Sequence, residues 1–366
     1  MIEWTTLRCV PLLAFCVLLA EPALAQPPTV ADLAGLPAEG PLSASAVKTI
    51  RDYVNHWVGV LKDAKGAEEV EKACGALARG YGLKNSTYFQ MEYATAIGVA
   101  VPKALAWQSV PLLRVKHVQL SRAVSKMEQI YVRPALDAML AHGNPGVRYW
   151  AAEGYRAISP KIVTFRGQRL REMLATLEKA GSREPSGLVL AKLFRVLSPD
   201  QPVEGRPGKD LRDTLAKVWR SGCKKVQKGD ENVLDGYGRS LMVIARVAQD
   251  DKTAALQLVW DLMQATSLAL LNGETQKDPA LVKTLTGLLT DLEEQAAKIL
   301  ALSQKPIQAV LADSARGLDQ KAMEVRLLVN TQWKELLKAR GVSTWEAVAP
   351  TTKPAATEPA DTKPAG

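Results

Sequence analysis

The sequence predicts an all-α protein, either a helical array of the α-solenoid type or an irregular helical bundle. Apolar side chains recur at three- and four-residue steps through most of the chain, the spacing that gathers them on one face of a helix. Valine, isoleucine and threonine rarely alternate with polar residues, as they would in a half-buried strand. Aromatic residues make up only 5% of the chain, which disfavours an all-β sandwich.

The first part of the chain is predicted to be a linker followed by a helical domain. Residues 26–41 are rich in proline and glycine, which favours the linker. Ser43 and Ser45 can cap the first helix, whose apolar stripe runs from Val47 to Leu61. The further helical patterns in the domain, 42–197, cover residues 70–78, 88–101, 110–132, 135–141, 147–158, 162–180 and 188–197.

A second linker is predicted at 198–209, where prolines and glycines are dense. Beyond it, a second helical region covers 210–340, and the glycines of 235–240 are interpreted as a helix interruption. Glu293 and Glu294 are expected on the solvent face of their helix. The helical patterns of this region cover residues 210–226, 234–247, 253–271, 279–300 and 318–336.

One segment resembles a known family. In residues 134–158, an apolar helix face is followed by the turn Asn144-Pro145-Gly146 and by a second helix that opens with Val147-Arg148 and continues through small residues. This pattern resembles a HEAT repeat, although Tyr155 stands where leucine is more usual and Gly154 replaces an alanine. The resemblance implies a HEAT-like α-solenoid of stacked helices with a binding surface, and it implies no substrate. No second copy is recognisable at the expected period of about 40 residues.

Both ends of the chain predict segments outside the helical part. A signal peptide, 1–25, cleaved after Ala25, is predicted by Arg8, by the apolar run from Val10 to Ala20, and by the small residues Ala23 and Ala25 at the positions that a signal peptidase reads. We therefore expect an exported protein, periplasmic or extracellular, whose mature chain has no transmembrane segment. Residues 341–366 consist mainly of alanine, proline and threonine and predict a disordered tail.

Positive charge is concentrated in the middle of the chain. The formal net charge is +9, and the excess of lysine and arginine falls within residues 101–228, between nearly neutral flanks. Such a region favours an acidic partner. Neighbours at three- and four-residue steps occur among Arg212, Lys217, Arg220, Lys224 and Lys228, and Arg171 lies close to Arg166 and Arg169 in the sequence. The candidate anion-binding residues are Arg156, Lys161, Arg166, Arg169, Arg220 and Lys224.

The two cysteines that follow the signal peptide have two interpretations. Cys74 and Cys223 either form one disulfide in an oxidising compartment or are two separately buried thiols. If Cys223 were exposed, the adjacent Lys224 and Lys225 would favour its thiolate.

No linear motif predicts catalysis. The three histidines, His56, His117 and His142, form no metal-binding pair, and the chain has no HExxH, CxxC, GxSxG, P-loop or GxGxxG sequence. No metal and no cofactor are expected. The sequence therefore favours an exported, non-enzymatic helical scaffold or binding protein that contacts an acidic protein, polysaccharide or lipid headgroup; nucleic acid is disfavoured. The alternative is an exported hydrolase with a composite site.

Overall fold

The described part of the chain is helical from end to end. The computed structural model describes residues 27–344 except 38, 85 and 166, and these contain no strand. The predicted signal peptide and its cleavage site, and the tail beyond residue 344, lie outside the described residues. No described helix is both long and apolar enough to cross a membrane. The elements are α1 (Val30–Ala34), α2 (Ala44–Asp63), α3 (Ala67–Gly82), α4 (Thr87–Leu105), α5 (Leu113–Val124), η1 (Ile130–Val132), α6 (Arg133–Leu140), α7 (Pro145–Phe165), α8 (Gln168–Arg183), α9 (Gly187–Leu197), α10 (Gly205–Val226), α11 (Glu231–Gly238), α12 (Leu241–Asp250), α13 (Lys252–Leu270), α14 (Gly273–Gln276), α15 (Pro279–Leu300), α16 (Pro306–Ala312), α17 (Leu318–Leu328), η2 (Val329–Trp333) and α18 (Lys334–Lys338).

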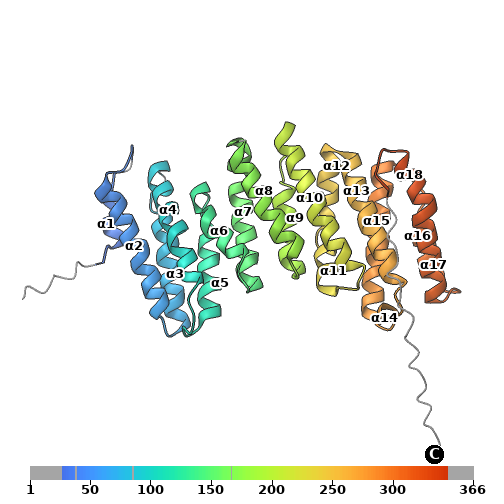
Figure 1. The fold of residues 1–366 in the computed structure, drawn as a ribbon, viewed down its shortest axis with the longest axis horizontal. Helices are drawn as coiled ribbons and strands as arrows, with labels where there is room; N and C mark the ends of the chain where they lie inside the picture. Colours follow the sequence, from blue (N-terminus) through green and yellow to red (C-terminus); the bar gives the residue numbers. More distant parts are fainter. Residues whose placement is uncertain (1–26, 38, 85, 166, 345–366) are drawn as a thin grey trace, which may run out of the picture.

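The helices stack side by side into an elongated array that follows the order of the chain from α1 to α18 (Figure 1). Two layers can be traced from the packing. The first layer contains α2, α4, α6, α8, α10 and α13, and the second contains α3, α5, α7, α9, α11 and α15. Within the first layer, α6 and α8 pack less closely than the other neighbours. Each helix therefore buries an apolar stripe against its own layer and against the opposite layer.

Contacts between neighbouring units of the array join residues at a nearly constant separation along the sequence. We call each pair of helices, one from each layer, a unit of the array. Arg133 pairs with Glu172, Lys217 pairs with Glu178, and Ser221 donates to the carbonyl of Ser182, each across 39 residues. Arg220 pairs with Asp261 across 41 residues, and Arg148 with Glu184 across 36. Although the sequence showed only one recognisable repeat, the helices of this part of the array are offset by 36–41 residues.

The predicted linker at 198–209 does not separate two domains. The loop ends before Gly205, where α10 begins, and Pro207 and Gly208 are buried in the first turn of that helix. Proline is tolerated there because the first N–H groups of a helix have no partner within the helix. α10 packs on α8 and α9, and one hydrophobic core extends from Leu33 to Val342. The regions 42–197 and 210–340 are thus parts of one array.

The predicted linker at 26–41 contains a short helix, α1. Thr29 and Asp32 cap it reciprocally: the Thr29 hydroxyl accepts from the backbone N–H of Asp32 at 3.3 Å, and the Asp32 carboxylate accepts from the N–H of Thr29 at 2.6 Å. Leu33 is fully buried. This capping box and one anchored leucine explain why the segment is ordered despite its composition.

Two predicted helix boundaries differ from the structure. The helix expected at 110–132 divides into α5 and η1, whereas α7 continues past residue 158 through Pro160 to Phe165. Pro160 has no N–H to donate to the carbonyl oxygen of Arg156, and the Ser159 hydroxyl donates to that oxygen instead, at 3.2 Å. This substitute hydrogen bond lets the helix run through the proline.

The beginning of the predicted tail belongs to the folded part. Val342 is 4% exposed, and the N–H of Ser343 donates to the side-chain oxygen of Gln257 on α13 at 2.9 Å. Ser343 is therefore held on α13.

Candidate anion-binding face

α8 and α10 lie next to each other in the first layer and run in parallel. Lys217 contacts Glu178 at 2.9 Å, and one turn further along both helices the Ser221 hydroxyl donates to the carbonyl of Ser182 at 2.9 Å. These contacts fix the register of the two helices.

The outward side of α10 carries a row of cations. Its exposed residues follow one another at three- and four-residue steps, the spacing of neighbours on a helix surface. Asp213 is the only carboxylate in the row. The row, called here the α10 ridge, consists of Arg206, Lys209, Asp213, Lys217, Arg220 and Lys224. On α8, the exposed residues Arg171, Lys179 and Arg183 lie beside the α10 ridge. The α10 ridge and these three residues together are called the basic face.

Only some of these cations are held by acidic partners. Arg220 is paired with Asp261, a fully buried carboxylate of α13, at 2.8 Å, and Lys217 is paired with Glu178. No hydrogen bond or ion pair joins the side chain of Lys209 or Lys224 to another described residue. The basic face therefore contains both anchored cations and cations that are free to meet an external anion.

Two grooves flank the basic face. The groove between α10 and α13 has a volume of about 640 Å³, and Lys209, Arg212, Lys217 and Arg220 contribute positive charge to its lining. The groove between α6 and α8, also about 640 Å³, includes Lys179, Arg183 and Arg148. Carboxylates are present in both grooves, so each has mixed charge with an excess of cations.

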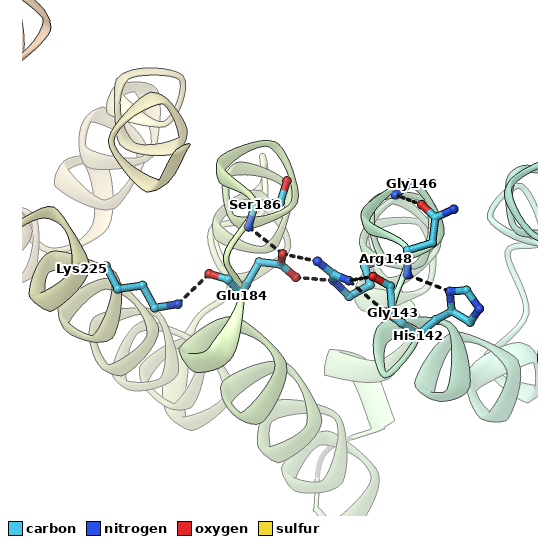
Figure 2. Close-up of polar contacts among 8 residues, drawn as sticks. His142, Gly143, Gly146, Arg148, Glu184, Ser186 and Lys225 are labelled. Atoms are coloured by element: carbon cyan, nitrogen blue, oxygen red, sulfur yellow. Dashed lines mark hydrogen bonds and ion pairs between the residues drawn. The ribbon is translucent and has the colours of Figure 1, made fainter. Parts of the chain in front are cut away.

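Arg148, the arginine of the HEAT-like segment, has a structural role. Its guanidinium binds both carboxylate oxygens of Glu184, at 2.7 and 2.8 Å, and also donates to the carbonyl oxygens of His142 and Gly143 (Figure 2). Glu184 accepts in addition from the N–H of Ser186. The network connects the α6–α7 turn to the α8–α9 turn, so Arg148 is not available to an external anion. We call this network of Arg148, Glu184 and the two turns the turn clamp.

The network continues one unit further along the array. The Lys225 ammonium of α10 donates to the carbonyl oxygen of Glu184 at 2.7 Å (Figure 2). Three successive units are thus connected at the same edge of the array.

The predicted anion-binding residues that the structure describes lie on different layers of the array. Arg169, Arg220 and Lys224 lie on α8 and α10. Arg156 and Lys161 lie on α7, in the second layer, where Arg156 pairs with Glu153 and the Lys161 ammonium donates to the carbonyl of Glu128. These five residues therefore do not meet in one groove, and Arg166 lies outside the described residues.

Four cations of the basic face were not singled out from the sequence: Arg206, Lys209, Lys179 and Arg183. The helical spacing of these residues could have predicted that those on one helix share a face. The spacing does not predict that α8 and α10 are neighbours.

The two cysteines are separate buried thiols. Cys74 lies in α3 and Cys223 in α10, helices that are far apart in the array, and both are free (Figure 1). The disulfide alternative is therefore wrong for this fold. Burial raises the pKa of the Cys74 thiol to about 12 and that of Cys223 well above its usual range, which disfavours a Cys223 nucleophile despite the adjacent lysines.

Glu293 is not on a solvent face as expected. It is fully buried, and its carboxylate accepts from the N–H groups of Ile307 and Gln308, at 2.8 and 2.7 Å, at the start of α16. The indole N–H of Trp333 donates to it as well, at 3.2 Å. Burial raises the pKa of Glu293 against these hydrogen bonds. The carboxylate thus fixes α16 and the C-terminal helices on α15, a structural role.

His117, which is buried, and His142, which is half-buried, form a pair with ring centroids 4.9 Å apart. The His117 ring donates from Nε2 to the carbonyl of Ala104 at 3.0 Å, and Nδ1 of His142 accepts from the N–H of Asn144 at 3.0 Å. Burial lowers the pKa of both rings, and His117 and Arg148 lower that of His142 further. No group of three or more metal-ligating side chains occurs among the described residues.

This pair predicts a loss of stability in mild acid. Because both folded-state pKa values lie below the ordinary value of 6.5, the unfolded chain binds more protons as the pH falls through that value. The free energy of unfolding is expected to be at its full value above about pH 6.5 and to fall below it. Urea unfolding near pH 7.5 and pH 5.5 measures the change, and His142→Gln should reduce it. An unaltered pH dependence in that variant would contradict this origin.

Comparisons with known proteins identify no family. No family model matches the chain, and no curated protein matches it. Two engineered proteins with crystal structures are similar at 14% identity. One covers 76% of this chain and 98% of its own with a TM-score of 0.26; the other covers 82% and 94% with a TM-score of 0.25. At these scores the likeness supports no inference about function.

Proposed function

We propose that the protein is an exported, HEAT-like helical scaffold that binds an extended acidic partner through the basic face of α8 and α10. The observation that carries the proposal is the α10 ridge, in which five exposed cations and one carboxylate follow one another at helical steps. The offset of 36–41 residues between units supports the solenoid description, and the apolar leader supports export.

The shape of the ridge favours a linear anion over a compact one. From Arg206 to Lys224 it extends about 27 Å along the helix axis, at 1.5 Å per residue. Cations one turn apart can each meet a successive negative group of a chain that lies along the helix. An acidic polysaccharide and an acidic stretch of polypeptide share this chemistry.

The free cations provide most of the attraction. Arg220 is committed to the buried Asp261, and Lys217 to Glu178, so these two hold their positions whether or not a partner is present. Lys209 and Lys224 lose no internal ion pair when they bind an external carboxylate. Binding is therefore expected to weaken as salt screens the exposed charges.

Binding of polygalacturonate and polyglutamate at low and high salt tests the proposal. The double variant Lys209→Glu/Lys224→Glu should lose affinity by about tenfold or more at low salt, since two exposed attractive contacts become repulsive. The matched control is Lys72→Glu/Lys283→Glu, which changes the net charge equally at exposed positions on α3 and α15. Equal losses in both double variants would show that only net charge matters and would overturn the assignment to this face.

A further inference from the structure

A pocket in the second layer lies apart from the basic face. It has a volume of about 400 Å³ and is formed by the last turns of α7 and α9, the loop that follows α9, and Leu211 of α10. This volume is within the range of small-molecule sites. Its walls are mostly aliphatic or prolyl: Pro160, Val163, Val196, Pro199, Pro202, Val203 and Leu211.

Two arginines accompany this apolar lining. Arg156 projects from α7 and is paired with Glu153 of its own helix at 3.0 Å. Arg195 projects from α9, and its Nε–H is buried with no hydrogen-bond acceptor among the described residues. A buried guanidinium N–H without an acceptor is costly, because the group has given up water without replacing it. No hydrogen bond or ion pair joins the Arg195 guanidinium to another described residue, so an anion bound in the pocket has this cation available as its counter-charge.

Two of the three remaining polar side chains of the pocket are already engaged. Asp200 is held by the guanidinium of Arg246, and the Ser159 hydroxyl donates to the backbone carbonyl of Arg156. Gln201 lies exposed in the loop. The carboxylate of Asp200 is thus directed to α12, which leaves Arg195 as the cation without a partner.

The chemistry of the lining limits the class of ligand that the pocket can bind. Among the described lining residues there is no aromatic ring on which a sugar or a base could stack, and few polar side chains are free to bind hydroxyl groups. The aliphatic walls suit a hydrocarbon chain, whose burial is favourable in proportion to its area. One uncommitted guanidinium matches one carboxylate, with which it can form two parallel hydrogen bonds.

From these observations we propose that this pocket binds an aliphatic monocarboxylate, with the carboxylate on Arg195, supported by Arg156, and the hydrocarbon chain against the valines and prolines of α7, α9 and the loop. The anchoring of Asp200 by Arg246 holds the loop wall in place before the ligand arrives. This site is independent of the proposed basic face, which lies on the other layer of the array.

Titration calorimetry of the full chain with decanoate, below its micelle-forming concentration, tests the inference. Decanoate should bind, while decanol should bind about tenfold more weakly or worse because it lacks the charge-assisted hydrogen bonds. Acetate should show no binding, because it has no chain to bury. Equal affinities for decanoate and decanol would overturn the carboxylate assignment.

Variants locate the site. Arg195→Leu should weaken decanoate binding by about tenfold to a hundredfold and leave decanol binding nearly unchanged. Arg51→Leu, an exposed arginine of α2 outside both the pocket and the basic face, is the matched control and should bind decanoate like the parent chain. If both variants lost the same affinity, the inference would be wrong.

Two further variants keep the test decisive if Arg195→Leu does not fold. Arg195→Lys retains a cation but loses the guanidinium fork, so it should bind decanoate with intermediate affinity. Val163→Trp fills the pocket from α7 and should abolish binding of both decanoate and decanol. Unchanged decanoate binding in both variants would place the ligand elsewhere.

Discussion

Arg148→Ala is expected to lower the free energy of unfolding by about 3–5 kcal/mol, the usual effect of removing one partner from a buried ion pair. The side chains of Arg148 and Glu184 are 13% and 2% exposed, so neither charge is well solvated. The variant leaves the carboxylate of Glu184 with the N–H of Ser186 as its remaining described hydrogen-bond donor. It also leaves the carbonyl oxygens of His142 and Gly143 without their shared donor.

Chemical denaturation of matched variants measures this effect. Arg148→Lys keeps the charge but cannot bind both carboxylate oxygens and both carbonyls, so its loss should be intermediate. Lys48→Ala is the control, because the Lys48–Asp52 pair within α2 is exposed at both ends, and we expect a change of less than about 1 kcal/mol. Similar small losses for Arg148→Ala and Lys48→Ala would show that the turn clamp contributes no stability to the array.

The second large effect is expected at the crossing of α9 and α11. Gly187 and Gly236 let the two backbones touch: a Cβ at Gly187 would lie 1.8 Å from the carbonyl oxygen of Asn232 and 2.7 Å from the nitrogen of Gly236. The clashing atoms belong to the backbone, so no rotamer change can relieve the overlap. Gly187→Ala should therefore destabilise the fold by about 3 kcal/mol or more, at or above the upper end for an overpacked site.

Gly75→Ala, which is also a substitution within a helix, is expected to stabilise the fold. Gly75 is inside α3, and a Cβ there would meet no atom within 4 Å. Alanine has a lower entropic cost in a helix than glycine, so this variant should gain about 0.5–1 kcal/mol. Thermal or urea unfolding compares the two variants directly. A Gly187→Ala protein as stable as Gly75→Ala would exclude close backbone contact between α9 and α11.

This glycine pair shows where local interpretation of the sequence was incomplete. The glycines of 235–240 were interpreted as a helix interruption, and α11 does end at Gly238. Gly236, however, is inside α11 and is required by the approach of Gly187, which is 49 positions earlier in the chain. Local sequence reveals the break in the helix, but a contact between distant glycines has no local pattern.

Glu293 shows in the same way that the local sequence does not determine which charged residue is buried. Its neighbour Glu294 pairs with Lys298 one turn away on the helix surface, as a solvent-facing acid would. Glu293 is one residue away but points toward the start of α16, whose N–H groups supply its hydrogen bonds. Helical position alone predicted exposure for both, and only the position of α16 distinguishes them.

The sequence by itself determined that this chain is helical, because the spacing of apolar residues and the capping residues act within one or two turns. It also located most of the positive charge in the central helices. Which cations share a surface was decided by the tertiary structure: Arg220 and Lys224 join Lys179 and Arg183 because α8 lies beside α10, while Arg156 is placed on the other layer. The physical reason is that helices in the middle of the array meet partners some 36–41 residues away, and such contacts depend on side-chain volume and register, which no local periodicity encodes.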